Sequence, residues 1–234
     1  MGHIVLVHGA WHGAWCWYRM LPALRALGLT PHAVELPGHG LRNGETQTLA
    51  AYAEAVAGVL RGLPEPALLV GHSMGGGVIS ATAELVPERI SKLVYLCALA
   101  LLPGDSIFGV AGGDEESILA GYMQPGADGR IVVADEGIRP CFYADCSDAD
   151  VALARLLLVP QSAEPFGAVP ELTEGRFGRV PRSYIVCEQD KAIGPKKQRW
   201  LAERAGAETV AIARSHSPFF SAPEELARVL KDLA

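Results

Sequence analysis

The sequence lacks long apolar runs, basic clusters and a regular cysteine pattern, and each absence excludes a class of protein. Half of the 234 residues are hydrophobic, yet no apolar stretch is long enough to span a membrane. The chain leads from Met1 directly into a short aliphatic run, without the pattern of a signal peptide. The net charge is −6 and no basic cluster is present, so nucleic acid is not an expected partner. We therefore expect a cytoplasmic protein that does not bind a membrane.

The cysteines are few and irregularly spaced, which argues against both disulfides and a metal site. An odd count cannot form a complete disulfide framework, and the spacings are not those of metal ligands. Cys97 and Cys187 lie in apolar, strand-like runs, where a free thiol behaves as a small hydrophobic side chain. No metal is therefore expected. The five cysteines are Cys16, Cys97, Cys141, Cys146 and Cys187.

Short aliphatic runs alternate with helical patterns through most of the chain, whose length is typical of one domain. Alternation of this kind with short connections predicts a doubly wound, mainly parallel sheet of the α/β class. The expected strands are residues 4–7, 32–36, 67–70, 90–97, 182–187 and 209–213. The expected helices are residues 14–27, 47–61, 74–86, 195–205 and 223–233.

The alternation stops between residues 102 and 180, where glycine, proline and aspartate become frequent. We interpret residues 102–180 as a small cap inserted over the sheet. The predicted core then consists of residues 1–101 and 181–234. The elements expected inside the cap are short helices near 114–123 and 148–158 and a brief strand at 131–133.

The pentapeptide Gly71-His72-Ser73-Met74-Gly75 follows an apolar strand and precedes a helix. Gly-x-Ser-x-Gly in that context is the signature of a nucleophile elbow, although the motif alone also occurs in ordinary glycine-rich turns. Glycines are needed on both sides because the turn brings the backbone against the neighbouring strand and helix. The turn lifts the Ser73 hydroxyl above the sheet, and the N-terminus of the next helix points toward it. We predict that Ser73 is a nucleophile.

A serine nucleophile needs a base within hydrogen-bond reach and an acid that orients the base. In the fold that carries a nucleophile elbow, the order along the chain is serine, acid and histidine. Asp190 follows the expected strand at 182–187, and His216 follows the last expected strand. We predict that His216 is the general base and that Asp190 orients it. Glu188 and Asp105 remain alternatives for the acid.

Two backbone N–H groups are expected to bind the oxyanion of a tetrahedral intermediate. One follows the nucleophile and belongs to Met74, and the other lies in the loop after the first strand, where Ala10 is the candidate. Gly9 lets the backbone of this loop approach closely. His8 and His12 are expected to form hydrogen bonds with the backbone and to shape the loop. The alternative is that the loop only packs.

Four stretches of the sequence together resemble one branch of the α/β hydrolases. The branch contains plant methylesterases, plant hydroxynitrile lyases and bacterial esterases, including pyrethroid hydrolases. The similarity runs over nearly the whole chain and is weakest around residues 105–140. The stretches are Val5 to Trp17, Leu36-Pro37-Gly38-His39-Gly40, Gly71-His72-Ser73-Met74-Gly75-Gly76 and Tyr184 to Lys191.

The resemblance implies an enzyme of the α/β-hydrolase fold that uses no cofactor and has a small cap over a hydrophobic pocket. Many members of the branch are homodimers, so a homodimer is an expected assembly. The catalytic triad of the branch falls on Ser73, Asp190 and His216. Its oxyanion donors fall on Ala10 and Met74. Both sets agree with the residues chosen from the motifs.

The same branch offers a second reaction, the cleavage of cyanohydrins. In the branch that this chain resembles, the lyases carry a threonine in the first loop and a lysine directly after the catalytic histidine. Gly9 and Ser217 occupy these two positions here, and both departures favour ester hydrolysis. Cyanohydrin cleavage and non-catalytic ligand binding by a hydrolase-fold protein remain the alternatives.

The aromatic side chains near the motifs predict a pocket for a bulky, uncharged ester, although any of them can instead belong to the core. His72 is expected to line the site beside the serine. The sequence thus predicts a serine carboxylesterase that forms an acyl-enzyme with a small-molecule ester. The candidate substrate contacts are Trp11, His72, Phe108, Tyr122, Phe142, Phe166 and Phe219.

Overall fold

Six parallel strands form the centre of the molecule. The computed structural model describes residues 2–234. The spatial order of the strands is β2-β1-β3-β4-β7-β8, and every neighbouring pair is parallel. The strands are β1 (His3–Val7), β2 (Thr30–Val34), β3 (Ala67–His72), β4 (Ile90–Leu96), β7 (Arg182–Cys187) and β8 (Glu208–Ile212). This confirms the expected doubly wound α/β sheet and, within one to two residues in most cases, its strands.

The order of the strands places a crevice at one point of the sheet. β1 pairs with β2 on one side and with β3 on the other, so the chain changes direction across the sheet at β1. In open α/β sheets, ligands bind outside the carboxyl ends of the strands at such a switch point. The loops after β1 and β3 both begin there. These are the loops that contain Ala10 and Ser73.

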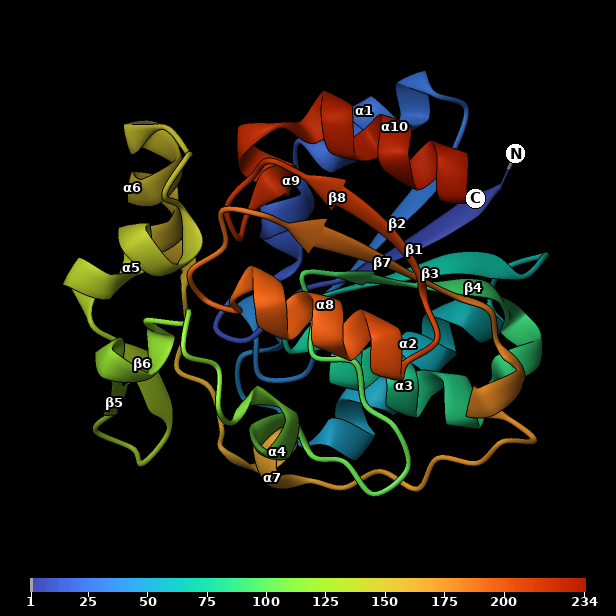
Figure 1. The fold of residues 1–234 in the computed structure, drawn as a ribbon, viewed down its shortest axis with the longest axis horizontal. Coiled ribbons are helices and arrows are strands. Elements are labelled where there is room, and N and C mark those ends of the chain that lie inside the picture. The colour runs from blue at the N-terminus through green and yellow to red at the C-terminus, as the bar shows by residue number, and fades with distance from the viewer. Residues whose placement is uncertain (1) are drawn as a thin grey trace.

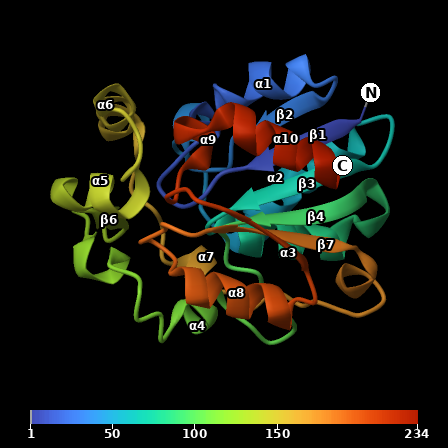
Figure 2. The same cartoon turned by 45° about the horizontal axis from the view of Figure 1, so that its top comes forward.

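Helices cover both faces of the sheet, and this explains why its central strands are buried along most of their length. Figures 1 and 2 show α1 and α10 on one face and α2, α3 and α8 on the other. Within residues 2–234, every helix is too short or too polar to cross a membrane. The helices of the two layers are α1 (Met20–Ala26), α10 (Pro223–Leu233), α2 (Leu49–Arg61), α3 (Gly75–Leu85) and α8 (Pro195–Arg204). Short elements connect them: η1 (Ala14–Trp17), η2 (Gly40–Arg42), η3 (Pro87–Arg89) and α9 (Pro218–Ser221).

Residues 102–180 contribute no strand to the six-stranded sheet. Their antiparallel β5–β6 hairpin, α5 and α6 lie together beyond the carboxyl ends of the strands, opposite the two chain termini (Figure 1). The end of this segment behaves differently, because Thr173 donates two hydrogen bonds to Glu84 on α3. The division into core and cap therefore stays a prediction. The elements are α4 (Ile107–Ala111), η4 (Leu119–Tyr122), β5 (Met123–Pro125), β6 (Ile131–Val133), α5 (Asp135–Phe142), α6 (Asp148–Leu157), α7 (Glu164–Gly167) and η5 (Phe177–Arg179).

Two expected helices are wrong in their extent. The helix expected at 14–27 is divided into η1 and α1. α1 begins at Met20, which places Pro22 in its first turn, where the missing N–H of proline costs nothing. The helix expected near 114–123 is replaced by α4 before it and the short η4 inside it.

Candidate active site

Ser73 occupies a sharp turn between the end of β3 and the start of α3. Its φ of 55° lies in the left-handed region, which is strained for a residue with a side chain. The glycines around it leave room for close backbone approach. A Cβ atom on Gly71 would lie 2.4 Å from the Gly75 carbonyl oxygen, and one on Gly75 would lie 2.8 Å from that of His8. The local geometry is therefore that of the predicted elbow.

Ser73 lies in the wall of a cavity of about 390 Å³. Most of the wall is apolar, and Asp114 and Ser117 are the other polar side chains that line it. Another cavity, of about 570 Å³, lies between α2, α3 and residues 164–171 and contains none of the predicted site residues. The cavity at Ser73 is lined by Ala10, Trp11, Ser73, Met74, Leu99, Ile107, Phe108, Ala111, Gly112, Gly113, Asp114, Ser117, Leu119, Ala120, Met123, Phe166, Ala192 and Ile193.

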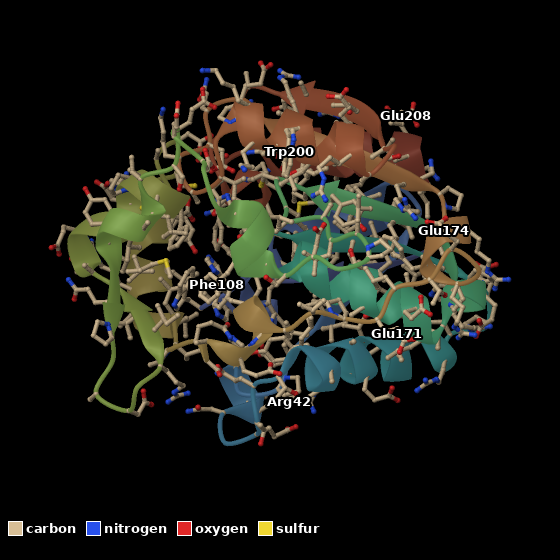
Figure 3. The ribbon with its side chains drawn as sticks, turned by 60° about the horizontal axis from the view of Figure 1, so that its bottom comes forward. Arg42, Phe108, Glu171, Glu174, Trp200 and Glu208 are labelled. Carbon is tan, nitrogen blue, oxygen red and sulfur yellow. The ribbon has the colours of Figure 1, made fainter. Side chains whose placement is uncertain are left out.

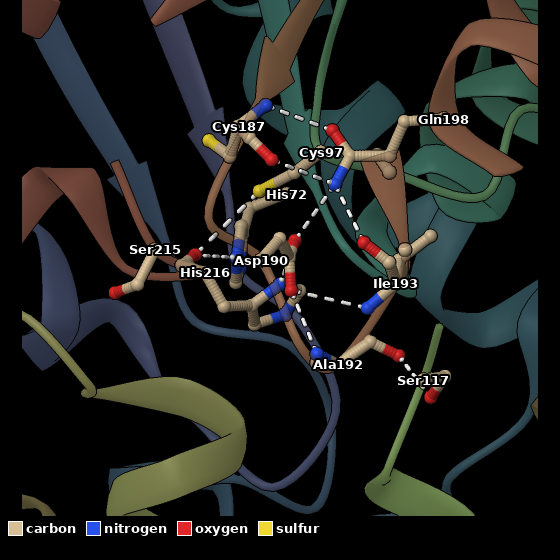
Figure 4. A network of polar contacts seen from close by, with 12 residues as sticks. His72, Cys97, Ser117, Cys187, Asp190, Ala192, Ile193, Gln198, Ser215 and His216 are labelled. Atoms are coloured by element: carbon tan, nitrogen blue, oxygen red, sulfur yellow. Dashed lines mark hydrogen bonds and ion pairs between the residues drawn. The ribbon is translucent and has the colours of Figure 1, made fainter. Parts of the chain in front are cut away.

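A buried carboxylate orients the ring of His216. The Nδ1 atom of His216 is 2.7 Å from Oδ2 of Asp190, and both side chains are almost completely shielded from solvent. Gln198 donates to the same oxygen, and the backbone N–H groups of Ala192 and Ile193 donate to Oδ1 (Figure 4). All of these partners donate to the carboxylate. This arrangement suits an ionised carboxylate that accepts a hydrogen bond from the Nδ1–H group of His216. Nε2 of the same imidazole then carries no proton and can act as a base.

The two alternative acids are engaged elsewhere. Glu188 forms an ion pair with Arg199 on the outside of α8, and both side chains are about half exposed. Asp105 pairs with Arg204 and accepts a hydrogen bond from the backbone of Leu102. Neither carboxylate contacts His216 within residues 2–234. The geometry therefore favours Asp190 as the acid.

The loop that carries His216 lies against the residue before the serine. His72 Nε2 donates to the backbone oxygen of His216 at 2.9 Å, and the centroids of the two rings are 4.5 Å apart. The Ser73 hydroxyl forms no hydrogen bond within residues 2–234, so the structure does not join it to His216 directly. Catalytic hydrogen bonds of this kind commonly tighten only when substrate is bound.

The first loop presents its backbone to the same cavity. Ala10 and Met74 both line it, and within residues 2–234 neither N–H donates a hydrogen bond. His8 Nδ1 lies 2.8 Å from the carbonyl oxygen of Gly9, and His12 Nδ1 lies 2.7 Å from that of Ala10. These contacts confirm that the two histidines shape the loop. Burial lowers the pKa of His12 to about 4 and that of His8 well below its usual range, so both rings are neutral at pH 7.

Three of the seven predicted substrate contacts line the cavity at Ser73. They are Trp11, Phe108 and Phe166. The ring of Phe108 stacks on that of Phe166 with centroids 5.0 Å apart, and the ring of Trp11 lies tilted against Phe166 at 6.1 Å. Figure 3 shows Phe108 at the surface, near the β5–β6 hairpin. Their role as substrate contacts stays a prediction.

The other four do not line this cavity, and their role as substrate contacts also stays a prediction. Phe219 is fully buried in the core against Trp17, and Tyr122 packs against α5 at Gly137. Phe142 is buried between the rings of Trp11 and His216. His72 is fully buried and binds the His216 backbone instead of facing the cavity. Aromatic composition alone cannot distinguish a pocket wall from the layer behind it.

One group of possible metal ligands within residues 2–234 overlaps this site. Side-chain atoms of His72, Cys97 and His216 lie within 4.8 Å of one another. Both rings already use a nitrogen, His72 on the backbone of His216 and His216 on Asp190. Burial raises the pKa of the Cys97 thiol well above its usual range, so the thiolate that would bind a metal is disfavoured. The arrangement suits a hydrogen-bonded histidine better than a metal centre.

Two residues of the site were not among the sequence candidates. Gln198 is fully buried, and its amide joins the backbone of Cys187 and Ile193 to the carboxylate of Asp190. Tyr143, also fully buried, follows α5 directly and lies 2.6 Å from Nε2 of His12. The sequence places Gln198 after the acid, in a stretch that resembles the family, but its burial and the partners of its amide are visible only in the structure. Tyr143 gave no signal in the sequence, because its partner lies 131 residues away.

Comparison with known proteins agrees with this fold. The pattern of a family described as "Alpha/beta hydrolase family" matches residues 4–229. The chain is 32% identical to putative methylesterase 14, chloroplastic, of Arabidopsis thaliana, over 98% of this chain and 71% of that protein. It is 30% identical to polyneuridine aldehyde esterase of Rauvolfia serpentina, over 99% and 95% of the two chains.

Solved structures give the same result. The crystal structure of polyneuridine aldehyde esterase superposes with a TM-score of 0.88 at 28% identity, covering 100% of this chain and 99% of that one. A pyrethroid hydrolase from Sphingobium faniae superposes with a TM-score of 0.86 at 28% identity, covering 99% and 96% of the two chains. The similarity thus includes residues 102–180 as well as the sheet.

Proposed function

The chain belongs to the alpha/beta hydrolase family and is a hydrolase of the carboxylesterase type, and from this premise we propose that Ser73 is its nucleophile. The observation that carries the proposal is the strained serine turn beside the buried His216–Asp190 pair, to which His72, the residue before the serine, is hydrogen-bonded. The substrate is a hydrophobic, uncharged carboxylic ester. An apolar cavity with no lysine or arginine in its wall supports that class over an anionic one.

The proposed reaction proceeds through an acyl-enzyme. His216 Nε2 takes the proton of the Ser73 hydroxyl while the serine oxygen attacks the ester carbonyl. The free N–H groups of Ala10 and Met74 stabilise the negative oxygen of the tetrahedral intermediate. His216 then protonates the departing alcohol. Water activated by the same ring hydrolyses the acyl-enzyme and releases the acid, while Asp190 stabilises the imidazolium in both steps.

The first loop argues against cyanohydrin cleavage. A Cβ atom at Gly9 would lie 2.9 Å from Cβ of Ser73 and 3.1 Å from Nδ1 of His72, so a threonine there would displace the nucleophile. The residue after His216 is Ser217, which is fully buried and has no cationic group. Ester hydrolysis therefore fits both positions better.

Hydrolysis of p-nitrophenyl esters from acetate to dodecanoate, with permethrin alongside, tests the proposed function. Wild type is expected to hydrolyse these esters, and Ser73→Ala is expected to lose the turnover while it remains folded. Equal turnover by the two proteins would refute Ser73 as the nucleophile. A folded wild type that hydrolyses no ester would refute the esterase. Release of cyanide from mandelonitrile would then identify a lyase, and ligand binding without turnover would identify a binding protein.

A further inference from the structure

Imidazole rings hold two consecutive carbonyl groups of the first loop. The backbone N–H of Leu36 donates to His8 Nε2 at 3.2 Å, so the proton of this neutral ring is on Nδ1 and is donated to the Gly9 oxygen. Within residues 2–234 all peptide bonds are trans. In a trans peptide the N–H points away from the C=O. The hydrogen bond from His8 to the Gly9 carbonyl therefore directs the N–H of Ala10, in the same peptide, away from His8.

The second ring is held in turn by a hydroxyl from outside the loop. His12 Nδ1 faces the carbonyl oxygen of Ala10, so it must carry the proton, and Nε2 of the neutral ring can only accept. The hydroxyl of Tyr143 lies 2.6 Å from Nε2 and is therefore the donor. Burial raises the pKa of Tyr143 and lowers that of His12, which keeps both groups in the neutral forms that this bond requires.

The position of Tyr143 makes it a link between two separate parts of the chain. It follows α5 in the segment 102–180, and its side chain is fully buried. Within residues 2–234 the ring of His12 is the only hydrogen-bond partner of its hydroxyl. The hydroxyl of Tyr143 thus forms its hydrogen bond with the loop that contains Ala10.

We infer that Tyr143 is a positioning residue of the active site, acting through His12 to hold the N–H of Ala10 toward the cavity. The inference rests on the proposed function, in which that N–H binds the oxyanion. The peptide before Ala10 is held by His8 and the peptide after it by His12, so the two rings together fix both backbone dihedral angles of Ala10. Without the hydroxyl, Nε2 of His12 is a buried acceptor with no donor.

The rest of the loop has independent anchors, so the loss of the hydroxyl should leave the fold intact. The indole N–H of Trp11 donates to the Ile131 oxygen at 2.9 Å, and the N–H of Val159 donates to the Trp11 oxygen at 2.9 Å. Removing the hydroxyl therefore loosens the Ala10 peptide more than it loosens the loop. The expected effect is on the transition state, because the oxyanion is absent from the bound ester.

Steady-state hydrolysis of p-nitrophenyl butyrate by Tyr143→Phe tests the inference. We expect kcat to fall roughly 10- to 100-fold, less than the 10²- to 10³-fold loss that follows complete removal of an oxyanion donor. KM is expected to change less than about threefold, because ground-state contacts are kept. The affinity for a trifluoromethyl ketone, which forms the oxyanion on Ser73, should weaken by the same factor as kcat/KM. In a His12→Phe background, Tyr143→Phe should have less than about a twofold effect.

Tyr95→Phe is the matched control, because it also removes a buried tyrosine hydroxyl, one bonded to Ser80 at 2.9 Å. It should keep the wild-type kcat. Three results would each overturn the inference. They are a near-normal kcat in Tyr143→Phe, an equal loss of kcat in Tyr95→Phe, and an undiminished effect of Tyr143→Phe on kcat in the His12→Phe background. If Tyr143→Phe fails to fold, His12→Phe alone must show the same loss of kcat. An inactive wild type would instead refute the proposed function, so the two failures are distinguishable.

Discussion

Replacing Asp190 by asparagine should inactivate the enzyme by changing the tautomer of His216. The carboxylate accepts four hydrogen bonds, from Ala192 and Ile193 at Oδ1 and from Gln198 and His216 at Oδ2. An asparagine NH₂ group at the Oδ1 position would leave two buried backbone donors unpaired. At the Oδ2 position it would leave only the Gln198 donor unpaired, provided that the His216 ring accepts at Nδ1. The second orientation is therefore favoured.

The magnitude of the effect follows from that orientation. One buried donor without a partner costs about 1–3 kcal/mol of folding stability, so the variant should fold with a lower urea midpoint. A ring that accepts at Nδ1 carries its proton on Nε2 and cannot take the proton of Ser73. The corresponding change in a serine protease lowers kcat about 10⁴-fold, or about 5 kcal/mol of transition-state stabilisation. We expect a loss of that order for Asp190→Asn.

The assay is kcat/KM for p-nitrophenyl butyrate, measured for wild type, Asp190→Asn and the control Glu188→Gln. Glu188→Gln makes the same change of carboxylate to amide two residues earlier, at a half-exposed side chain paired with Arg199. It should stay within about threefold of wild type, because exposed ion pairs contribute little. The reasoning is refuted if Asp190→Asn keeps more than about a tenth of the activity, or if the control loses as much.

Three further outcomes are expected. Gly75→Ala should destabilise the fold by about 1–3 kcal/mol, because the new Cβ would lie 2.8 Å from the His8 carbonyl oxygen; an unchanged urea midpoint would contradict this. Burial lowers the pKa values of His8, His12 and His72, so the unfolded chain binds protons below pH 6.5 that the native chain does not. The free energy of unfolding should be highest above about pH 6.5 and fall toward pH 4, and His12 alone should contribute about 3 kcal/mol to this fall. Urea midpoints that do not change between pH 7.5 and 4.5 would contradict this. Phe108→Ala removes a ring of the cavity wall that stacks on Phe166. The change should lower kcat/KM for long-chain esters about 2- to 10-fold and leave that for the acetate unchanged. An equal loss on both esters would place the ring outside the substrate path.

The sequence predicted the sheet and the elbow because their determinants are local. Aliphatic runs such as Leu68–Val70 specify buried strands, and the glycines at 71 and 75 meet steric demands within a few residues. The order of serine, acid and histidine along the chain then points to Asp190 and His216, which the structure brings within 2.7 Å of each other. Local pattern and fold rules were enough for this part of the site.

The region between residues 102 and 180 was harder to predict, since its elements are short and their partners are distant. α5 contains both Gly137 and Pro140, which argue against a helix on propensity alone, and the hairpin strand β5 has only three residues. The inferred role of Tyr143 depends on the ring of His12, which lies 131 residues earlier in the chain. Similarly, Phe219 and Phe108 are alike in sequence, yet only packing decides that one is core and the other lines the cavity.

The order of the strands also determines which strand lacks a neighbour while the chain is being synthesised. β4 is an inner strand that pairs with β3 and β7, but it ends at Leu96, whereas β7 begins at Arg182. At roughly 5–20 residues per second, synthesis of the intervening segment takes about 4–17 s. Until β7 is synthesised, the apolar run Leu93–Leu96 has no partner strand on that side, and an unpaired strand of this kind can pair with other nascent chains. Yield of soluble protein should therefore depend on chaperone supply and on translation speed through residues 97–181.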